Sequence, residues 1–151
     1  MQATRESRAY PSAVCEEQAT LLCCIARREE SGLCLRVLPQ ITVQNGGTII
    51  NDRGEKNEKG TWGKPFRWID YSGVVDNNYR VGVLIVPSVH NARPCWSHSR
   101  DYGVLVANPF PRQPRERPEP FTKTAVRKGE RFSLSYSILV YEELLSEKHG
   151  Y

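Results

Sequence analysis

The sequence lacks any long apolar run. The longest, VGVLIV at Val81–Val86, has the length of a β-strand and is far shorter than the ~18 residues that a membrane-spanning helix needs. Residues 1–18 contain no apolar core and include acidic side chains, so they do not resemble a secretory signal peptide. We therefore expect a soluble protein without a membrane partner, and a cytoplasmic location by default.

The signatures of metal and cofactor sites are also missing. The chain has five cysteines, an odd number, and no CxxC pair, so their spacing does not match that of a zinc site. Without an export signal, reduced thiols are the default expectation. There are only three histidines and no GxSxG, P-loop or GxGxxG motif. We expect no metal ion and no cofactor.

The positive charge of the chain is confined to one stretch. The formal net charge is +4, and residues 112–131 carry seven Arg/Lys and three Glu, which leaves the rest of the chain neutral overall. Five prolines lie in or beside this stretch. They favour an extended, solvated loop over the basic helix or aromatic-studded sheet of a nucleic-acid binder. We expect no nucleic-acid partner.

Residues 1–40 differ in character from the rest of the chain. Four apolar residues between Val14 and Ile25 recur at roughly helical spacing, and Gly32 supplies a stop signal for a helix. Two interpretations stay open: one amphipathic helix, or a segment that is poorly ordered or not native coding sequence. We treat residues 1–40 as an atypical N-terminal segment.

From Ile41 onward the pattern is that of β-strands. In Arg131–Tyr141, apolar and aromatic residues alternate with serines at a period of two, as in a half-buried antiparallel strand. Tyr79–Pro87 is apolar on both faces, as in a central strand of a packed sheet. Residues 51–60 are polar and bounded by glycine, which predicts a loop. The sequence predicts strands at residues 46–51, 64–73, 79–87, 102–109 and 131–141.

Strands without helices between them predict an all-β fold, an antiparallel β-sandwich with at most one N-terminal helix. The domain should span residues 41–145. Five strands are few for a closed sandwich, so we expect an incomplete sandwich that is the C-terminal part of a larger domain. Its core should centre on Val81, Val83, Ile85, Val104, Val106, Leu134, Tyr136 and Ile138.

Three blocks of sequence resemble a known bacterial family. They are WGKPFRWIDYSG, VGVLIVPSVHNARPCWSHSRDYGVLVANPF and KGERFSLSYSILVY, in this order, and the resemblance covers about residues 46–141. The family is that of PmoA-like domains, which carries the name methane oxygenase PmoA. Residues 1–40 do not resemble the longer β-rich region that usually precedes these blocks. The matching positions include Asp70, Asn91, Arg93, Trp96, His98, Arg100, Tyr102 and Asn108.

The resemblance implies an all-β domain similar to the supersandwich of sugar mutarotases and related carbohydrate-active proteins. It therefore implies that the chain binds or modifies a carbohydrate or another small polar ligand. The chain is not a genuine membrane methane monooxygenase subunit, because such a subunit crosses the membrane several times and this sequence cannot form one such helix.

The stretch His90–Gly103 gathers polar and aromatic residues between two apolar strands, where a connection at a sheet end commonly carries binding residues. His98 is the candidate proton donor or acceptor, because imidazole titrates near neutral pH. Arg100 would orient a substrate or stabilise an oxyanion, and Trp96 would stack on a sugar. We expect these three side chains close together in a partly open polar concavity. The predicted ligand-binding set also includes Asp70, Asn91, Arg93, Tyr102 and Asn108.

A structural interpretation of the same residues stays open. In it, Arg100 and Asp101 pair with each other or with loop backbone, and Trp96 belongs to the core. The chain is then a non-catalytic structural or interaction domain, or a truncated and inactive family member. A buried Trp96 with Arg100 bonded only to backbone would favour this interpretation. The sequence does not predict an oligomeric state.

Overall fold

The computed structural model describes residues 32–75, 78–110 and 128–145. In this part of the chain, eight strands form two antiparallel four-stranded sheets, so the fold is all-β as predicted. Sheet A has the order β1 (Leu33–Arg36), β7 (Val104–Asn108), β6 (Cys95–Arg100) and β3 (Pro65–Phe66). Sheet B has the order β2 (Thr48–Asn51), β4 (Ile69–Val75), β5 (Tyr79–Pro87) and β8 (Tyr136–Leu144).

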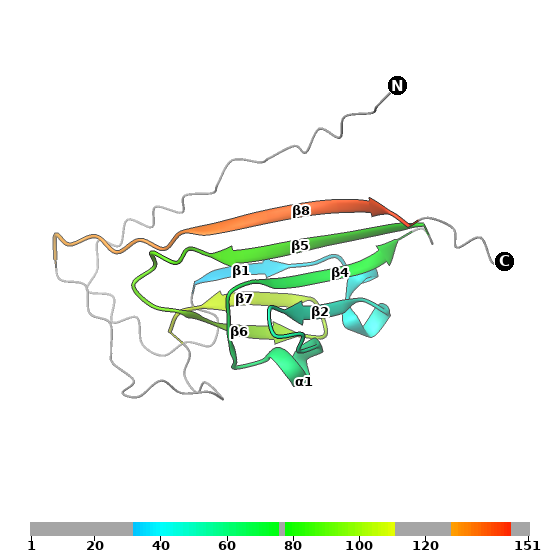
Figure 1. Ribbon diagram of the computed structural model, residues 1–151, viewed down its shortest axis with the longest axis horizontal. Coiled ribbons are helices and arrows are strands. Elements are labelled where there is room, and N and C mark those ends of the chain that lie inside the picture. The colour runs from blue at the N-terminus through cyan, green and yellow to red at the C-terminus, as the bar shows by residue number, and fades with distance from the viewer. Residues whose placement is uncertain (1–31, 76–77, 111–127, 146–151) are drawn as a thin grey trace, which may run out of the picture.

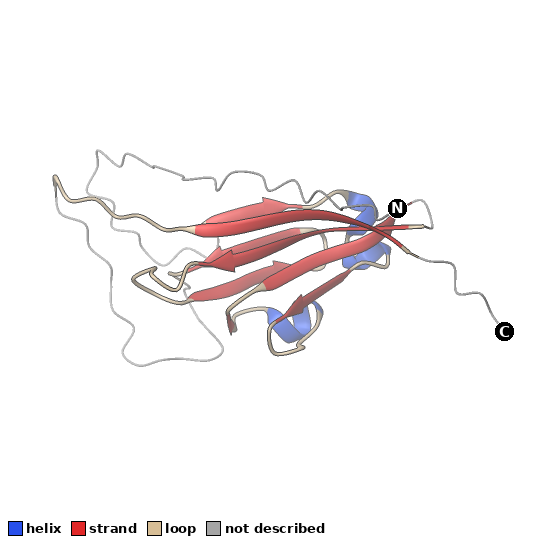
Figure 2. Ribbon diagram, turned by 45° about the horizontal axis from the view of Figure 1, so that its top comes forward, coloured by secondary structure: helices blue, strands red, loops and turns tan. Residues whose placement is uncertain are grey.

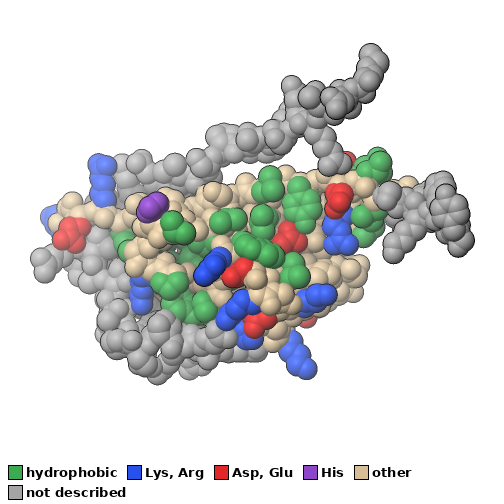
Figure 3. All heavy atoms as spheres, in the orientation of Figure 1, with side chains coloured by type: hydrophobic (Ala, Val, Ile, Leu, Met, Phe, Trp, Pro, Cys, Tyr) green, Lys and Arg blue, Asp and Glu red, His purple; other side chains and the backbone are tan. Residues whose placement is uncertain are grey.

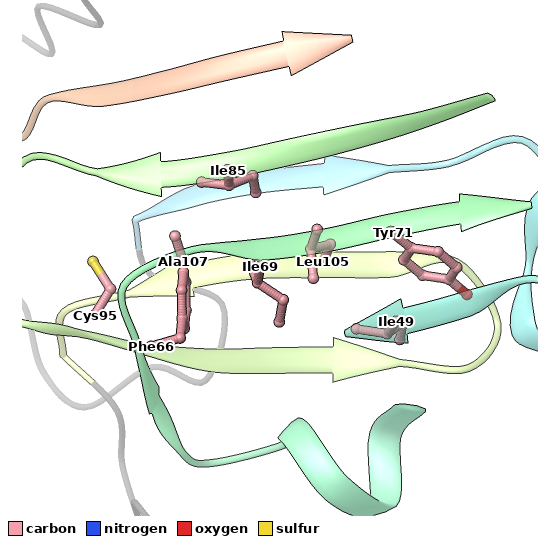
Figure 4. Packing of buried hydrophobic residues seen from close by; sticks show 8 residues of the cluster. All are labelled: Ile49, Phe66, Ile69, Tyr71, Ile85, Cys95, Leu105 and Ala107. Carbon is pink, nitrogen blue, oxygen red and sulfur yellow. The ribbon is translucent and has the colours of Figure 1, made fainter. Parts of the chain in front are cut away.

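The two sheets pack face to face as a sandwich, with sheet B in front of sheet A in Figure 1. Because side chains alternate along a strand, each strand sends every second residue between the sheets. The resulting core draws on six of the strands, and Figure 4 shows its members. They are Ile49, Phe66, Ile69, Tyr71, Ile85, Cys95, Leu105 and Ala107.

Two 3-10 helices, η1 (Pro39–Ile41) and η2 (Val43–Asn45), and one α-helix, α1 (Asn57–Thr61), occur in the described residues, at the periphery of the strands in Figure 2. α1 packs against β2 and β6 and so bridges the two sheets. Its buried Thr61 places Oγ1 2.6 Å from the Ser99 hydroxyl on β6. The prediction of a loop at residues 51–60 was therefore wrong in its last part. Five helical residues are too few to show a helical period in the sequence.

Three of the five predicted strands correspond to β2, β5 and β7. The predicted strand at residues 64–73 is two strands, because the chain leaves sheet A after β3 and enters sheet B at β4. The predicted strand at residues 131–141 begins only at Tyr136 and continues to Leu144. β1, which lies within residues 1–40, and β6, which lies in the predicted connection, were not predicted.

The predicted core is partly confirmed. Ile85 is completely buried between the sheets, whereas the equally buried Val106 faces the outer side of sheet A opposite His98. Val104 is also buried, on that same outer side. The other predicted core residues are half-buried: Val81, Val83, Leu134, Tyr136 and Ile138.

Two expectations fall outside the described residues: the N-terminal helix and most of the basic stretch, residues 112–127. Within the described residues, every helix is too short to cross a lipid bilayer.

Candidate functional site

The predicted catalytic residues lie on a strand. Cys95, the first residue of β6, belongs to the core between the sheets. Alternation along β6 therefore points Trp96, His98 and Arg100 to the outer face of sheet A. Antiparallel pairing with β7 fixes their spacing along this face. Within His90–Gly103, the prediction of an irregular connection holds for residues 90–94 and for the turn at residues 101–103.

His98 is 5% exposed, and N–H donors face both of its ring nitrogens. Trp62 Nε1–H lies 3.2 Å from Nδ1, and Arg100 Nε–H lies 3.3 Å from Nε2, so each can donate to its nitrogen when that nitrogen carries no proton. A neutral imidazole accepts at one nitrogen and carries its proton on the other. A ring enclosed by two donors has no nitrogen turned toward a ligand. These contacts favour a structural role for His98 over the predicted proton transfer.

Arg100 is bound by side chains of α1. Its Nη1 donates to Glu58 Oε1 across 2.6 Å, and both side chains are partly exposed. Glu58 Oε2 accepts from the Asp101 backbone N–H, and Asp101 Oδ1 accepts from the Glu58 backbone N–H. Burial raises the pKa of Glu58, but the hydrogen bonds from Arg100 and Asp101 outweigh burial and lower it overall. This reciprocal network fastens α1 to the turn after β6.

Trp96 does not offer the predicted stacking surface, since it is 3% exposed. Asn108, its partner on β7, is 1% exposed and accepts a hydrogen bond from the backbone N–H two residues further on. The ring beside Arg100 is instead that of Trp62, whose centroid lies 5.4 Å from the guanidinium carbon, within cation–π range. Trp62 also meets the His98 ring edge-on.

The other predicted ligand-binding residues of this stretch do not gather around His98. Asn91, in the loop before β6, exchanges two hydrogen bonds with the backbone of Ser135. Arg93, in the same loop, lies over a phenylalanine ring. Tyr102 is 45% exposed and follows the opposite end of β6. These residues are therefore distributed over both ends of the strand.

Asp70 lies in the other sheet. Its neighbours Ile69 and Tyr71 belong to the core, so Asp70 faces outward from sheet B. Tyr141 on β8 reaches across β5, and its hydroxyl donates to Asp70 Oδ1 across 2.9 Å. Gly82 on β5 makes this contact possible, because a Cβ at that position would lie 2.6 Å from the tyrosine ring.

Two more polar residues complete the cluster. Ser72 is 3% exposed, and Arg80 Nη1 donates to its hydroxyl across 3.4 Å. Burial raises the pKa of Asp70, although the hydrogen bonds from Tyr141 and Ser72 and the charge of Arg80 oppose that shift. Burial likewise raises the pKa of Tyr141. We refer to Asp70, Ser72, Arg80 and Tyr141 as the Asp70 cluster.

The Asp70 cluster lies on a face that exposes apolar side chains. Trp68, two residues before Asp70 and on the same side, is 36% exposed. Val86 and Leu139 face the same way and are 37% and 49% exposed. Figure 3 looks onto this face and shows hydrophobic side chains gathered over sheet B, with charged side chains among them. The indole of Trp68 thus lies two residues from the carboxylate of Asp70, whereas Arg80 pairs with Val74 at the other end of β4.

Metal and thiol chemistry find little support in the described part of the chain. No three side chains among its His, Cys, Asp and Glu residues come together as a candidate metal site. Burial raises the pKa of Cys95 to about 12, and its Sγ lies 4.0 Å from the Tyr136 hydroxyl. At neutral pH Cys95 is therefore a buried thiol and not a nucleophilic thiolate.

Sequence reasoning missed Tyr141, Arg80, Glu58 and Trp62. One signal for Tyr141 was available, because the lone Gly82 within an apolar strand marks a place where another group approaches the backbone closely. Glu58 and Trp62 gave no such signal. Glu58 lies in α1 and Trp62 follows it directly, and the sequence predicted most of this short helix as a loop.

Comparison with known proteins gives one match. Residues 14–149 match a family described as "Family of unknown function (DUF6807)". No curated protein and no solved structure matches the chain.

Proposed function

The chain belongs to the DUF6807 family, a family of unknown function, and we propose that this protein binds a carbohydrate on the outer face of sheet B. The observation that carries the proposal is that Asp70, held by Tyr141, lies two residues from the exposed Trp68 on the outer face of sheet B. The resemblance to the PmoA-like family, which implies a carbohydrate ligand, stays a prediction and points the same way.

The chemistry of this face matches that of a sugar. An indole ring stacks on the apolar C–H face of a pyranose, and Trp68 exposes such a ring. Sugar hydroxyls both donate and accept hydrogen bonds, so they suit a site that offers both kinds of group. Asp70 provides an acceptor, and the guanidinium of Arg80 provides donors. The strands β4 and β5, which carry these groups, are paired along seven residues, so the site is rigid.

The same geometry favours binding over catalysis. Asp70 is 8% exposed and held by Tyr141 and Ser72, so it is placed to accept a hydrogen bond at the base of the site. A nucleophile or proton donor would need closer access to the ligand. The predicted catalytic histidine, His98, is in the other sheet, in contacts with Trp62 and Arg100. We therefore infer a lectin-like activity without bond cleavage.

A glycan array tests the proposal. The purified full chain should bind at least one class of immobilised glycan, and Trp68→Ala should weaken that binding roughly tenfold through loss of stacking. Trp62→Ala is the matched control, because it removes the same side chain from the His98 network and should leave glycan binding unchanged. Failure of the wild-type chain to bind any glycan, or equal binding by Trp68→Ala, would overturn the proposal.

A further inference from the structure

β8 is the edge strand of sheet B. Within the described residues it pairs only with β5, along all nine of its residues. Edge strands in natural proteins are usually short or protected by lysine, proline or a bulge, because a free edge can pair with another chain. β8 has no lysine, proline or bulge in its sequence YSILVYEEL, and its two charged residues, Glu142 and Glu143, lie near its C-terminal end. Its free edge is therefore suited to pairing with a further strand.

Residues 131–135, just before β8, continue the pattern of the strand. Exposed and half-buried residues alternate from Arg131 through Ile138 without interruption. Ser135 accepts a hydrogen bond from the Ser88 backbone N–H just after β5, but residues 131–135 belong to no assigned strand of the described structure, although the sequence predicts a strand from Arg131. An alternating segment that has no ladder partner among residues 32–75, 78–110 and 128–145 is suited to pairing with a strand from outside them.

Exposed apolar side chains flank the free edge on both faces of the strand. Leu139, on the outer face of sheet B, is 49% exposed, and Val140 and Leu144, on the opposite face, are 64% and 61% exposed. A group that docks on one face alone would leave the other face in water. A strand added to the edge brings its own side chains to both faces.

We propose that β8 pairs antiparallel with the β8 of a second copy of this chain, with the two-fold axis at Ser137. This register extends the pairing over residues 131–143 of both copies. Two four-stranded sheets then become one continuous eight-stranded sheet. The side-chain pairs are Ile138 with the partner's Tyr136, Val140 with the partner's Leu134, and Glu143 with the partner's Arg131.

Charge and polarity favour a second copy of this chain as the partner of β8, and they favour antiparallel pairing. Arg131 and Glu143 are both exposed and lie six positions on either side of Ser137, so antiparallel pairing brings each to the opposite charge of the other copy. Parallel pairing in register would instead place like charges together. On one face Leu134 and Tyr136 meet the partner's Val140 and Ile138, and Phe132 meets Glu142; on the other, Ser133 and Ser135 meet Tyr141 and Leu139, and Ser137 meets its own copy. The symmetry of a two-fold interface requires this self-complementarity.

This inference does not rest on the proposed carbohydrate site. The pairing uses the backbone edge of β8 and residues 131–143, whereas the sugar site is centred on Trp68 and Asp70 in and beside β4. The glycan array tests the sugar site, and the molecular mass tests the β8 pairing. Either proposal can therefore fail while the other holds.

Sedimentation equilibrium of the full chain over a concentration series provides the first test. The expected species has twice the mass of the 17.2 kDa chain. Arg131→Glu and Glu143→Arg should each weaken the dimer roughly tenfold, because each creates two like-charge contacts at the interface. The double variant restores both pairs with reversed signs and should dimerise as the wild type does. Circular dichroism of each variant checks that it folds.

Cross-linking provides the second test. Ser137→Cys should form an intermolecular disulfide on mild oxidation, because directly opposed residues of antiparallel strands have Cα atoms ~5 Å apart, within disulfide range. Ser133→Cys is the matched control: it lies on the same face but opposite the partner's Tyr141, so it should cross-link no more than the wild-type chain. Cross-linking of the wild-type chain measures the contribution of the native cysteines, which is subtracted.

Three results would overturn the proposal. They are a monomer throughout the concentration series, a dimer that neither single charge variant weakens, and equal cross-linking of Ser137→Cys and Ser133→Cys. Failure of the double charge variant to recover the dimer would overturn the register with its axis at Ser137.

Discussion

The hydroxyl of Tyr141 on β8 donates a hydrogen bond to the carboxylate of Asp70 on β4, across the whole width of the intervening strand β5. The contact is possible because Gly82 leaves the surface of β5 bare between them. It joins three strands on the outer face of sheet B and positions the acceptor of the proposed sugar site.

Gly82→Ala should damage this site. The new Cβ would lie 2.6 Å from the Tyr141 ring and 2.7 Å from the Ser72 Cβ, so Tyr141 must move off the strand. We expect a loss of about 1–3 kcal/mol in the free energy of unfolding, measured by urea denaturation, together with weaker glycan binding. Gly60→Ala is the control, because its Cβ would make only ordinary contacts in α1. Equal stability of Gly82→Ala and wild type would contradict the account of this contact.

The stability of the protein should depend on the protonation of Asp70. Burial raises the pKa of Asp70 above its ordinary value of 3.8, so the folded state binds the proton more tightly than the unfolded chain does. Protonation of Asp70 therefore contributes to the free energy of unfolding. This contribution is complete below the pKa that Asp70 has in the unfolded chain, and it is lost as the pH rises through the pKa that Asp70 has in the folded protein. Asp70→Asn mimics the neutral form and should gain stability relative to the wild type over that window. Urea denaturation at a series of pH values measures the difference.

A second variant tests whether Asp70 is the cause of this pH dependence. Tyr141→Phe removes a donor that stabilises the Asp70 carboxylate, so the pKa of Asp70 should rise further and the window should move to higher pH. Carboxyl carbon shifts in an NMR titration follow this directly. If the wild type instead became more stable relative to Asp70→Asn as the pH rises, the pKa of Asp70 would be lowered by folding, contrary to the prediction.

His98→Ala should destabilise the fold without affecting glycan binding. The substitution removes a nearly buried imidazole that accepts a hydrogen bond from either Trp62 Nε1–H or Arg100 Nε–H, which should cost about 1–3 kcal/mol. His90→Ala, at an exposed position in the loop after β5, is the matched control and should change little. Unchanged stability of His98→Ala together with lost ligand binding would support the sequence prediction of a functional histidine instead.

Ile85→Ala should be among the more damaging core substitutions. The side chain is completely buried between the sheets, so its truncation should cost about 2–5 kcal/mol. Val89→Ala removes a side chain that is 91% exposed and should leave chemical denaturation unchanged. A similar midpoint for the two variants would mean that β5 is not central to the core.

Much of sheet B could be predicted because its strands carry strong local signals. The period-two pattern of β8 and the apolar run of β5 depend only on neighbouring residues, and both elements were identified. β6 was missed because residues such as His98 and Arg100 are polar, and polar residues on a buried strand do not produce an apolar alternation. β3 and β4 were merged because nothing in the local sequence marks the crossing from one sheet to the other.

The candidate site was less accessible to sequence reasoning. Asp70 was identified, but its partner Tyr141 lies 71 positions further along the chain, and only the topology of sheet B brings the two together. His98 and Arg100 lie on one face of β6, with Arg100 Nε 3.3 Å from His98 Nε2. Their enclosure by Glu58 and Trp62 depends on where α1 packs, which no local pattern records.

NMR of the tryptophan side chains shows directly whether a glycan binds on the outer face of sheet B. The chain has three tryptophans, and they report on different places: Trp68 on the outer face of sheet B, Trp62 in the His98 network and Trp96 on sheet A. The three indole N–H signals are followed while a glycan selected by the array is titrated into the full chain. We predict that the Trp68 signal moves and saturates while the other two stay in place. Movement of the Trp62 or Trp96 signal with an unchanged Trp68 signal would contradict it.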